Sequence, residues 1–193
     1  MNEPKANRPI SGFILSGGKS RRMGTDKSLL KIDGITMLEK AILLVEPFCT
    51  SVAISGLKNV SQYEKYPVIS DLVPDCGPIS GIYSCLKQSK TEWNFFIGVD
   101  VPFLDSTLLD FLIRQIDSAD CVVPKHSAGV EPLVGIYRRR ILPVVGEMIE
   151  AGTYKMTQLL SRIDTRFVDC NQQIERNPKL FYNVNTPEDF RLV

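Results

Sequence analysis

The chain has 193 residues, of which 44% are hydrophobic and 23% charged, and its mean hydropathy is −0.02. This composition can fill a core, so it excludes a disordered, collagen-like or membrane-spanning chain. Lysine and arginine number 23 against 22 aspartate and glutamate residues. Bulk charge therefore favours neither nucleic acid nor a membrane as a partner, and an anionic ligand would need a local site.

The cysteines and the N-terminus bear on the compartment and on domain organisation. The five cysteines are scattered, with no C-x-x-C spacing, which favours buried thiols in a reducing compartment over disulfides or a zinc site. Residues 1–9 are expected to form a flexible leader, and the apolar stretch from Ile10 to Leu15 is too short for a signal-peptide core. We therefore expect a cytoplasmic protein with one domain over residues 10–193.

Short apolar strands and amphipathic helices alternate over the first 120 residues. The predicted strands are Phe13 to Leu15, Ser51 to Ser55, Val68 to Ile69, Trp93 to Val99 and Cys121 to Val123. The predicted helices run from Thr36 to Val45, from Pro78 to Leu86 and from Leu108 to Ile116. This alternation requires right-handed parallel crossovers, so it predicts an α/β fold with a doubly wound, mostly parallel sheet.

The rest of the chain is less regular. The predicted strands are Leu133 to Tyr137, Phe167 to Val168 and Asn183 to Asn185, and the predicted helices are Ile141 to Ile149 and Thr157 to Leu160. Thr186 to Asp189 has the pattern of a helix N-cap, with proline at the first position and acids in the first turn. No repeat or linker separates this part, so we expect it to pack onto the same sheet.

A glycine-rich, basic segment, LSGGKSRRMGTDK from Leu15 to Lys27, follows the first strand. Glycines let backbone N–H groups close around phosphate oxygens, and Arg21, Arg22 and Lys27 can offset polyphosphate charge. The P-loop spacing is not met, because its first glycine would fall on Phe13, and no G-x-G-x-x-G follows the strand. The segment predicts a phosphate-binding loop of another kind rather than an ordinary surface turn.

Two aspartates follow predicted strands at the edge where open α/β sheets bind ligands. Asp100 is well placed to hold Mg²⁺ against nucleotide phosphates, although a helix-capping role before Val101 is the alternative. Asp71 could accept hydrogen bonds from a base or a ribose. Asp26, Asp105 and Glu131 have no comparable placement and are expected to be surface acids. The single histidine, His126, lies in a polar loop without a partner motif and is expected to be incidental.

The segment LSGGKSRRMGTDKSLL resembles the L-A-G-G-x-S-x-R-M-G-x-D-K-x-L-L signature of the molybdenum cofactor guanylyltransferases. The similarity continues through Asp71 with Gly77 to Ile82, Val99 to Pro102, Glu131 to Leu133 and Asn183 to Asp189. Ser16, Ser55, Val99 and Lys155 stand where the family usually has alanine, asparagine, cysteine and arginine. The resemblance implies a glycosyltransferase-A-like nucleotidyltransferase fold, a three-layer Rossmann-like arrangement with helices on both faces of the sheet.

The resemblance also implies an activity: Mg²⁺-dependent transfer of GMP from GTP to the terminal phosphate of Mo-molybdopterin, with release of pyrophosphate. The residues implied for catalysis are Arg22, Lys27 and Asp100, with Asp100 as the Mg²⁺ ligand. Those implied for nucleotide binding are Leu15, Ser16, Gly17, Gly18, Lys27, Asp71 and Asp100. Lys155, Asn183 and Asn185 are implied for the acceptor, and transient contact with cofactor-insertion or molybdoenzyme chaperone proteins is implied as well.

Two alternatives stay open. A sibling enzyme that uses CTP, to make a cytosine dinucleotide cofactor or an activated sugar, would need the same phosphate loop; Gly17 with Gly18 favours guanine, because the cytidylyl relatives more often carry alanine then glycine. A non-catalytic nucleotide-binding protein of the same fold is the other. The presence of both Lys27 and Asp100 favours an enzyme, since neither is needed for folding.

Overall fold

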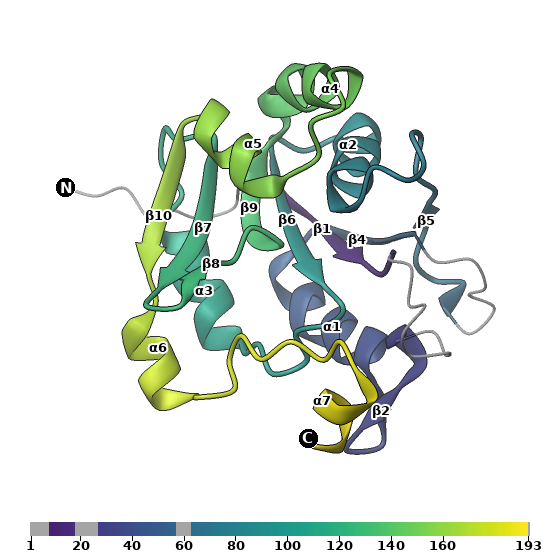
Figure 1. Ribbon diagram of the computed structural model, residues 1–193, viewed down its shortest axis with the longest axis vertical. Coiled ribbons are helices and arrows are strands. Elements are labelled where there is room, and N and C mark those ends of the chain that lie inside the picture. Colours follow the sequence, from purple (N-terminus) through teal and green to yellow (C-terminus); the bar gives the residue numbers. More distant parts are fainter. Residues whose placement is uncertain (1–7, 18–26, 57–62, 193) are drawn as a thin grey trace.

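The computed structural model describes residues 8–17, 27–56 and 63–192, which form layers of helices around one large sheet (Figure 1). The sheet has the order β10-β7-β9-β6-β1-β4-β5, with β8 paired to β7. Its strands are β1 (Ile10–Leu15), β4 (Ser51–Ser55), β5 (Val68–Ile69), β6 (Trp93–Gly98), β7 (Cys121–His126), β8 (Gly129–Val130), β9 (Val134–Arg138) and β10 (Thr165–Asp169). Along the order, all neighbours are parallel except β9, which is antiparallel to β6 and β7. The expected mostly parallel sheet is confirmed.

Helices cover both faces of the sheet, as the sequence predicted. They are α1 (Met37–Val45), α2 (Pro78–Gln88), α3 (Ser106–Arg114), α4 (Leu142–Glu150), α5 (Met156–Arg162), α6 (Asn171–Arg176) and α7 (Pro187–Arg191). Figure 1 draws α1 and α3 behind the sheet. Along β1, Ile14 packs into the core on the α1 side, and Phe13 and Leu15 pack into the core on the α2 side, because successive side chains of a strand point to opposite faces.

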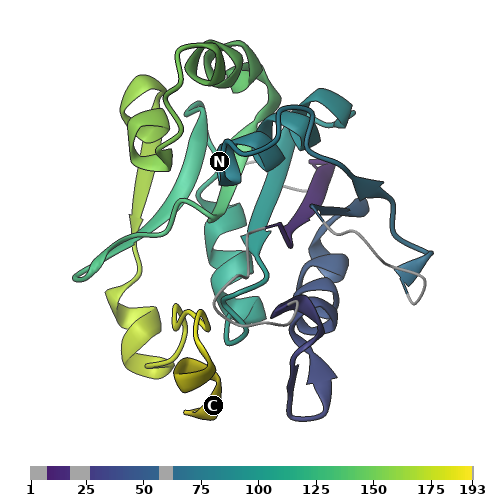
Figure 2. The same ribbon diagram turned by 45° about the vertical axis from the view of Figure 1, so that its right-hand side comes forward.

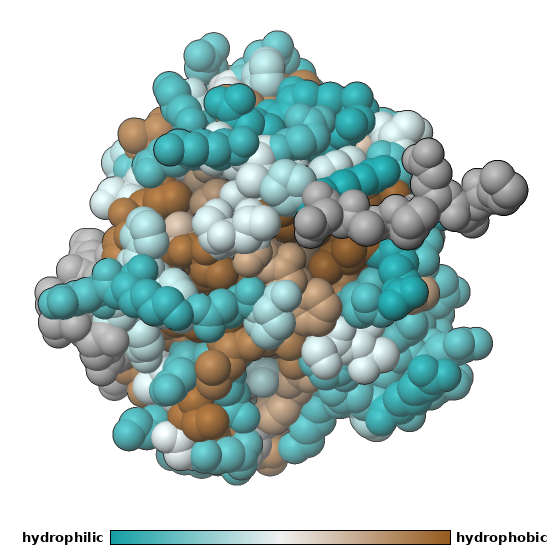
Figure 3. Space-filling model, turned by 180° about the vertical axis from the view of Figure 1, so that it is seen from behind, coloured by the Kyte–Doolittle hydropathy of each residue, from teal (hydrophilic) through white to brown (hydrophobic). Residues whose placement is uncertain are grey.

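The face behind the sheet carries apolar surface between polar residues, as the view from behind shows (Figure 3). Leu43 of α1 is one of the exposed large apolar side chains of the described chain, with 55% of its surface accessible. None of the helices in the described part of the chain is long and apolar enough to cross a membrane. The longest, α2, has 11 residues, whereas a spanning helix needs about 20.

The structure differs from the sequence predictions mainly at the C-terminal end. The predicted strand from Asn183 to Asn185 is wrong, because this segment has no ladder of backbone hydrogen bonds to the sheet in the described structure. The Val184 N–H donates to the carbonyl of Asp100, just beyond the end of β6, at 2.8 Å. The Asn185 N–H donates instead to the Asp189 carboxylate at 2.9 Å, so no ladder can form. The predictions missed α6, β8 and a small hairpin of β2 (Lys31–Ile32) and β3 (Ile35–Thr36). Of the expected leader, residues 1–7 lie outside the described residues.

A buried tyrosine ties the loop before β9 to the core. Tyr137 is fully buried, and its hydroxyl donates to the Pro132 carbonyl at 2.6 Å. Pro132 belongs to the turn from Glu131 to Leu133, which reaches the carboxyl edge of β6 through the Gly98 N–H bond to the Leu133 carbonyl at 3.0 Å. The hydroxyl of Tyr137 therefore helps to fix the backbone beside that edge.

We expect Tyr137→Phe to lower the free energy of unfolding by about 1 kcal/mol, because it leaves the Pro132 carbonyl without this donor. Urea unfolding of the variant beside the wild type measures the change. Tyr83→Phe is the matched control, since Tyr83 lies partly exposed on α2 with a lysine ammonium over its ring, and it should leave the midpoint unchanged. Equal midpoints for Tyr137→Phe and the wild type would contradict the prediction.

Candidate active site

The carboxyl ends of three parallel strands meet at one edge of the sheet. Leu15 of β1 is in register with Ser55 of β4 on one side and with Gly98 of β6 on the other. Residues in register point to the same face of a sheet, and Leu15 packs into the core on the α2 side. These three positions therefore form a row beneath α2, at the edge where open α/β sheets bind their ligands.

Helix α2 approaches this row at Gly81. A Cβ atom at Gly81 would lie 3.0 Å from Ser55 Oγ, 3.2 Å from Leu15 Cδ2 and 3.8 Å from Asp71 Oδ1. The structure thus brings together Leu15 and Asp71, two of the residues predicted for nucleotide binding. Burial raises the pKa of Asp71 above its ordinary value. A hydrogen-bond donor or a cation beside this carboxylate would therefore stabilise its charged form.

Asp100 lies at the end of β6 with its carboxylate folded back over the strand. A Cβ atom at Gly98 would lie 2.6 Å from Asp100 Oδ1, so the carboxylate occupies space that any other residue at position 98 would fill. Burial raises the pKa of Asp100, and the positive charge of Lys27 opposes that rise. The helix-capping alternative for Asp100 is wrong, because the cap of α3 is Asp105, whose side chain accepts from the Leu108 N–H at 2.9 Å.

The predicted acceptor segment lies against the predicted catalytic residues. Lys27 begins a short 3-10 helix, Lys27–Leu29, and its Nζ donates to Asn185 Oδ1 at 2.5 Å. The Val184 N–H donates to the backbone carbonyl of Asp100 at 2.8 Å. Figure 2 shows the C-terminal segment in yellow at the end of the molecule toward which the β6 arrow points. The structure therefore joins Lys27, Asp100 and Asn185 into one cluster.

The remaining predicted residues divide into those that the structure describes and those that it does not. Gly18 and Arg22 lie outside the described residues. Ser16 and Gly17 follow β1 at the same edge, and Ser16 Oγ is buried without a hydrogen-bond partner within the described chain. Lys155 is exposed at the N-terminus of α5, and among the described residues no hydrogen bond or ion pair joins it to the acceptor segment. Next to it, an interaction with Cys76 raises the pKa of Tyr154, and Cys76 lies just before α2.

Sequence reasoning missed a contact between His126 and Phe181, which lies just before Asn183. The His126 ring stacks on Phe181, with centroids 5.1 Å apart and an interplanar angle of 10°. His126 Nε2 lies 3.0 Å from Glu131 Oε1, and Nδ1 accepts from the Ala128 N–H at 3.2 Å. His126 and Glu131 are therefore structural partners rather than incidental residues. Their five-residue spacing across a Gly129 turn was the available signal.

The Asp100 carboxylate suits a Mg²⁺ ion whose other ligands are water and substrate phosphates. Within the described chain, no group of three or more His, Cys, Asp or Glu side chains converges on one point. Mg²⁺ does not need such a cage, because it commonly keeps several waters and binds one or two carboxylates together with substrate phosphates. The partly buried Asp100 carboxylate, whose pKa burial raises, would gain from a nearby cation. Asp100 therefore fits the role of a single protein ligand.

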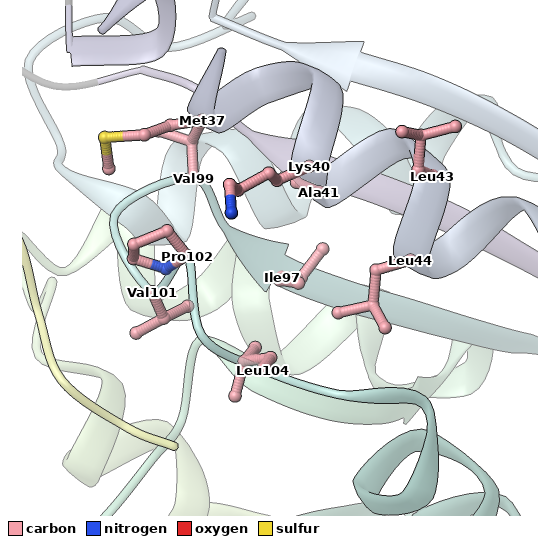
Figure 4. Close-up of a pocket in the computed structure, with 10 residues that line it drawn as sticks. All are labelled: Met37, Lys40, Ala41, Leu43, Leu44, Ile97, Val99, Val101, Pro102 and Leu104. Atoms are coloured by element: carbon pink, nitrogen blue, oxygen red, sulfur yellow. The ribbon is translucent and has the colours of Figure 1, made fainter. Parts of the chain in front are cut away.

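A cavity of about 220 Å³ lies on the opposite side of the sheet edge, between α1 and the chain that follows β6 (Figure 4). Its lining includes Ile97, Val99 and Val101, whose side chains belong to the core on the α1 side. Lys40, which contributes the one charged side chain of this lining, donates to Asp33 Oδ2 at 3.0 Å. The cavity has no phosphate-binding character, so the cluster around Asp100 is the better candidate site.

Comparison with known proteins shows the family of this chain. Residues 12–166 match the family model of the MobA-like NTP transferase domain. The molybdenum cofactor guanylyltransferase of Serratia proteamaculans is 32% identical over 184 residues, which cover 93% of this chain and 91% of that protein. The resemblance predicted from the sequence is therefore confirmed.

Solved structures of other proteins have the same fold. The crystal structure of molybdopterin-guanine dinucleotide biosynthesis protein A from Archaeoglobus fulgidus superposes with a TM-score of 0.80 at 23% identity and covers 94% of this chain and 95% of that chain. A structure of Rv0371c from Mycobacterium tuberculosis, described as a complex with manganese, has a TM-score of 0.70 at 18% identity and covers 95% of this chain and 97% of that chain. At these identities the two structures support the fold alone. Because the family model spans most of its length, the chain belongs to the MobA-like NTP transferase family and is a nucleotidyltransferase.

Proposed function

We propose that this enzyme transfers GMP from GTP to the terminal phosphate of Mo-molybdopterin and releases pyrophosphate. The observation that carries the proposal is the cluster at the carboxyl edge of the sheet, where the Lys27 ammonium lies between the Asp100 carboxylate and the segment with Asn183 and Asn185. A cation and a carboxylate at that edge suit a triphosphate with a divalent ion. Relatives named molybdenum cofactor guanylyltransferase support the choice of substrates.

In the proposed reaction, an oxygen of the acceptor phosphate attacks the α-phosphorus of GTP. A new P–O bond forms, the bond from the α-phosphorus to the bridging oxygen breaks, and pyrophosphate leaves with that electron pair. The acceptor is already an anion, so no general base is needed. Lys27, together with Arg22, would neutralise charge on the α-phosphate and the leaving group, because transfers of this kind depend on alignment and charge neutralisation.

Asp100 would hold a divalent cation, proposed to be Mg²⁺, against the phosphates. When bound, such a cation neutralises phosphate charge and orients the leaving group. Asp71 and Leu15 would contact the nucleoside beneath α2, with Ser16, Gly17 and Gly18 continuing the binding loop. Asn183, Asn185 and Lys155 would bind the acceptor.

The proposed layout is a single nucleotidyltransferase domain over residues 10–193. Its N-terminal part would bind the nucleotide and its C-terminal part the acceptor. Because the product is labile, we propose that the enzyme passes it on during transient contact with cofactor-insertion or molybdoenzyme chaperone proteins in the cytoplasm.

Parallel turnover assays with GTP and CTP test this proposal. We expect pyrophosphate release that depends on both Mo-molybdopterin and GTP, with kcat/KM for GTP higher than for CTP by about tenfold or more, because a site that hydrogen-bonds one base leaves its polar groups unpaired with another. Omission of the acceptor is the control and should abolish release. A preference for CTP would identify a cytidylyl enzyme instead, and the absence of turnover with either nucleotide would reject the reaction.

A further inference from the structure

The hydrogen bond between Lys27 and Asn185 joins two parts of the site that are 158 residues apart in sequence. Lys27 Nζ donates to Asn185 Oδ1 at 2.5 Å. Asn185 presents an oxygen to the ammonium, which is the reverse of what a phosphate would need, because a phosphate accepts hydrogen bonds and must be met by donors. This contact therefore serves the cation, and the N–H donors of the same amide are the groups suited to an acceptor phosphate.

Asn185 is itself held firmly by its own segment. Its backbone N–H donates to Asp189 Oδ2 at 2.9 Å, and the Thr186 N–H donates to the same oxygen at 2.8 Å. Thr186 Oγ1 accepts in turn from the Asp189 N–H at 3.1 Å, which completes a capping box at the start of α7. The buried neighbour Val184 is bonded to the Asp100 carbonyl. The backbone of Asn185 thus has a fixed place relative to the end of β6, and its exposed side chain extends from there to Lys27.

An amide oxygen orients an ammonium group without neutralising it. A lysine ammonium has three donors, so one bond to Asn185 Oδ1 leaves two donors for phosphate oxygens. A long lysine side chain would otherwise lose rotamer freedom when it is fixed against a ligand. An oxygen that holds the ammonium beforehand reduces that loss on binding.

We propose that Asn185 is a positioning residue that presents the Lys27 ammonium to the triphosphate, so that the C-terminal segment contributes to nucleotide binding before the acceptor arrives. This inference rests on the proposed function, because it assigns Lys27 to a nucleoside triphosphate. It differs from an acceptor-binding role in a measurable way: a positioning residue affects GTP binding when no molybdopterin is present.

Titration calorimetry of GTP with Mg²⁺, in the absence of molybdopterin, tests the proposal. We expect Asn185→Ala to weaken GTP binding by about threefold to tenfold, the range that corresponds to the net contribution of one typical hydrogen bond. Glu188→Gln is the matched control, because it removes a charge from the same exposed turn and should leave GTP affinity unchanged. Unchanged or tighter GTP binding by Asn185→Ala would overturn the proposal.

A double-mutant cycle assigns the effect to the lysine. If Asn185 acts through Lys27, Asn185→Ala should have no further effect on GTP affinity in a Lys27→Met background, whereas additive losses would show that the two residues act independently and would overturn the proposal. A raised KM for the acceptor with unchanged GTP binding would likewise leave Asn185 as an acceptor contact only.

A second measurement separates this inference from the proposed function. If the wild type binds no GTP, the proposed function fails, and the contact is tested in the ligand-free protein by the rate at which an acylating reagent modifies Lys27, followed by mass spectrometry. We expect faster modification of Lys27 in Asn185→Ala than in the wild type and in Glu188→Gln. Equal rates would mean that Asn185 does not hold the ammonium, and the inference would be wrong.

Discussion

Asp100→Asn is expected to reduce metal-dependent turnover by about a thousandfold, because the amide keeps the shape of the carboxylate but not its charge for a divalent cation. The same substitution should stabilise the protein in the absence of metal. Burial raises the pKa of Asp100, with Lys27 opposing that rise, so the ionised carboxylate costs the folded state free energy at neutral pH. We expect a higher Tm for the variant than for the wild type at pH 7.5 in EDTA.

The difference in Tm between Asp100→Asn and the wild type should depend on pH in a defined direction. A carboxyl group whose folded pKa is raised costs the folded state nothing below its unfolded pKa of about 3.9, and the full cost above its folded pKa. The difference in Tm between Asp100→Asn and the wild type should therefore shrink when the pH is lowered from 7.5 to 4. Asp110→Asn, on the exposed face of α3 where Asp110 pairs with Arg114, is the control for turnover. Normal metal-dependent turnover by Asp100→Asn would reject the assignment of Asp100 to the metal.

The sequence predicted most of the fold because hydrophobic periodicity determines which faces can be buried. The strand from Trp93 and the helix after Thr36 were read in this way, and both lie within one residue of the observed elements β6 and α1. Periodicity does not determine strand direction, so it could not reveal that β9 runs antiparallel. The predicted strand from Asn183 failed for a related reason. A short alternation of apolar and polar residues resembles a strand even where a side chain, here the Asp189 carboxylate, accepts the backbone hydrogen bond instead of a neighbouring strand.

The candidate site could be predicted in part. Asp100 and Lys27 were singled out by their places after a strand and within a basic loop, and the structure brings them close together. The contact of His126 with Phe181 could not be foreseen, because the two rings are about 55 residues apart in sequence and are brought together by tertiary packing. The bond from Lys27 to Asn185 was hidden for the same reason, since no local pattern links positions so far apart.

Gly98→Ala is expected to reduce turnover by about a hundredfold while the fold persists. A Cβ atom at position 98 would lie 2.6 Å from Asp100 Oδ1, and the next atoms would be Asp100 Cγ at 3.8 Å and Leu133 Cβ at 4.0 Å. The new methyl group therefore displaces the end of one flexible side chain and nothing rigid, so the free energy of unfolding should change by no more than about 1 kcal/mol. A displacement of about 1 Å at a reacting centre is enough for a hundredfold loss. Steady-state kinetics at varied Mg²⁺ concentration, beside urea unfolding, measures both effects.

Gly146→Ala provides the matched control, because a Cβ atom there meets only Tyr83 Cε2 at 3.5 Å, on α4 and away from the sheet edge. It should gain helix stability and keep wild-type turnover. If Gly98 acts by leaving room for the carboxylate, Gly98→Ala should also need more Mg²⁺ for half-maximal rate, because Asp100 no longer reaches its place over the strand. Wild-type turnover with an unchanged Mg²⁺ requirement would mean that the folded-back position of Asp100 is not the one used in the reaction, and the metal would then have to be held by the carboxylate in another conformation.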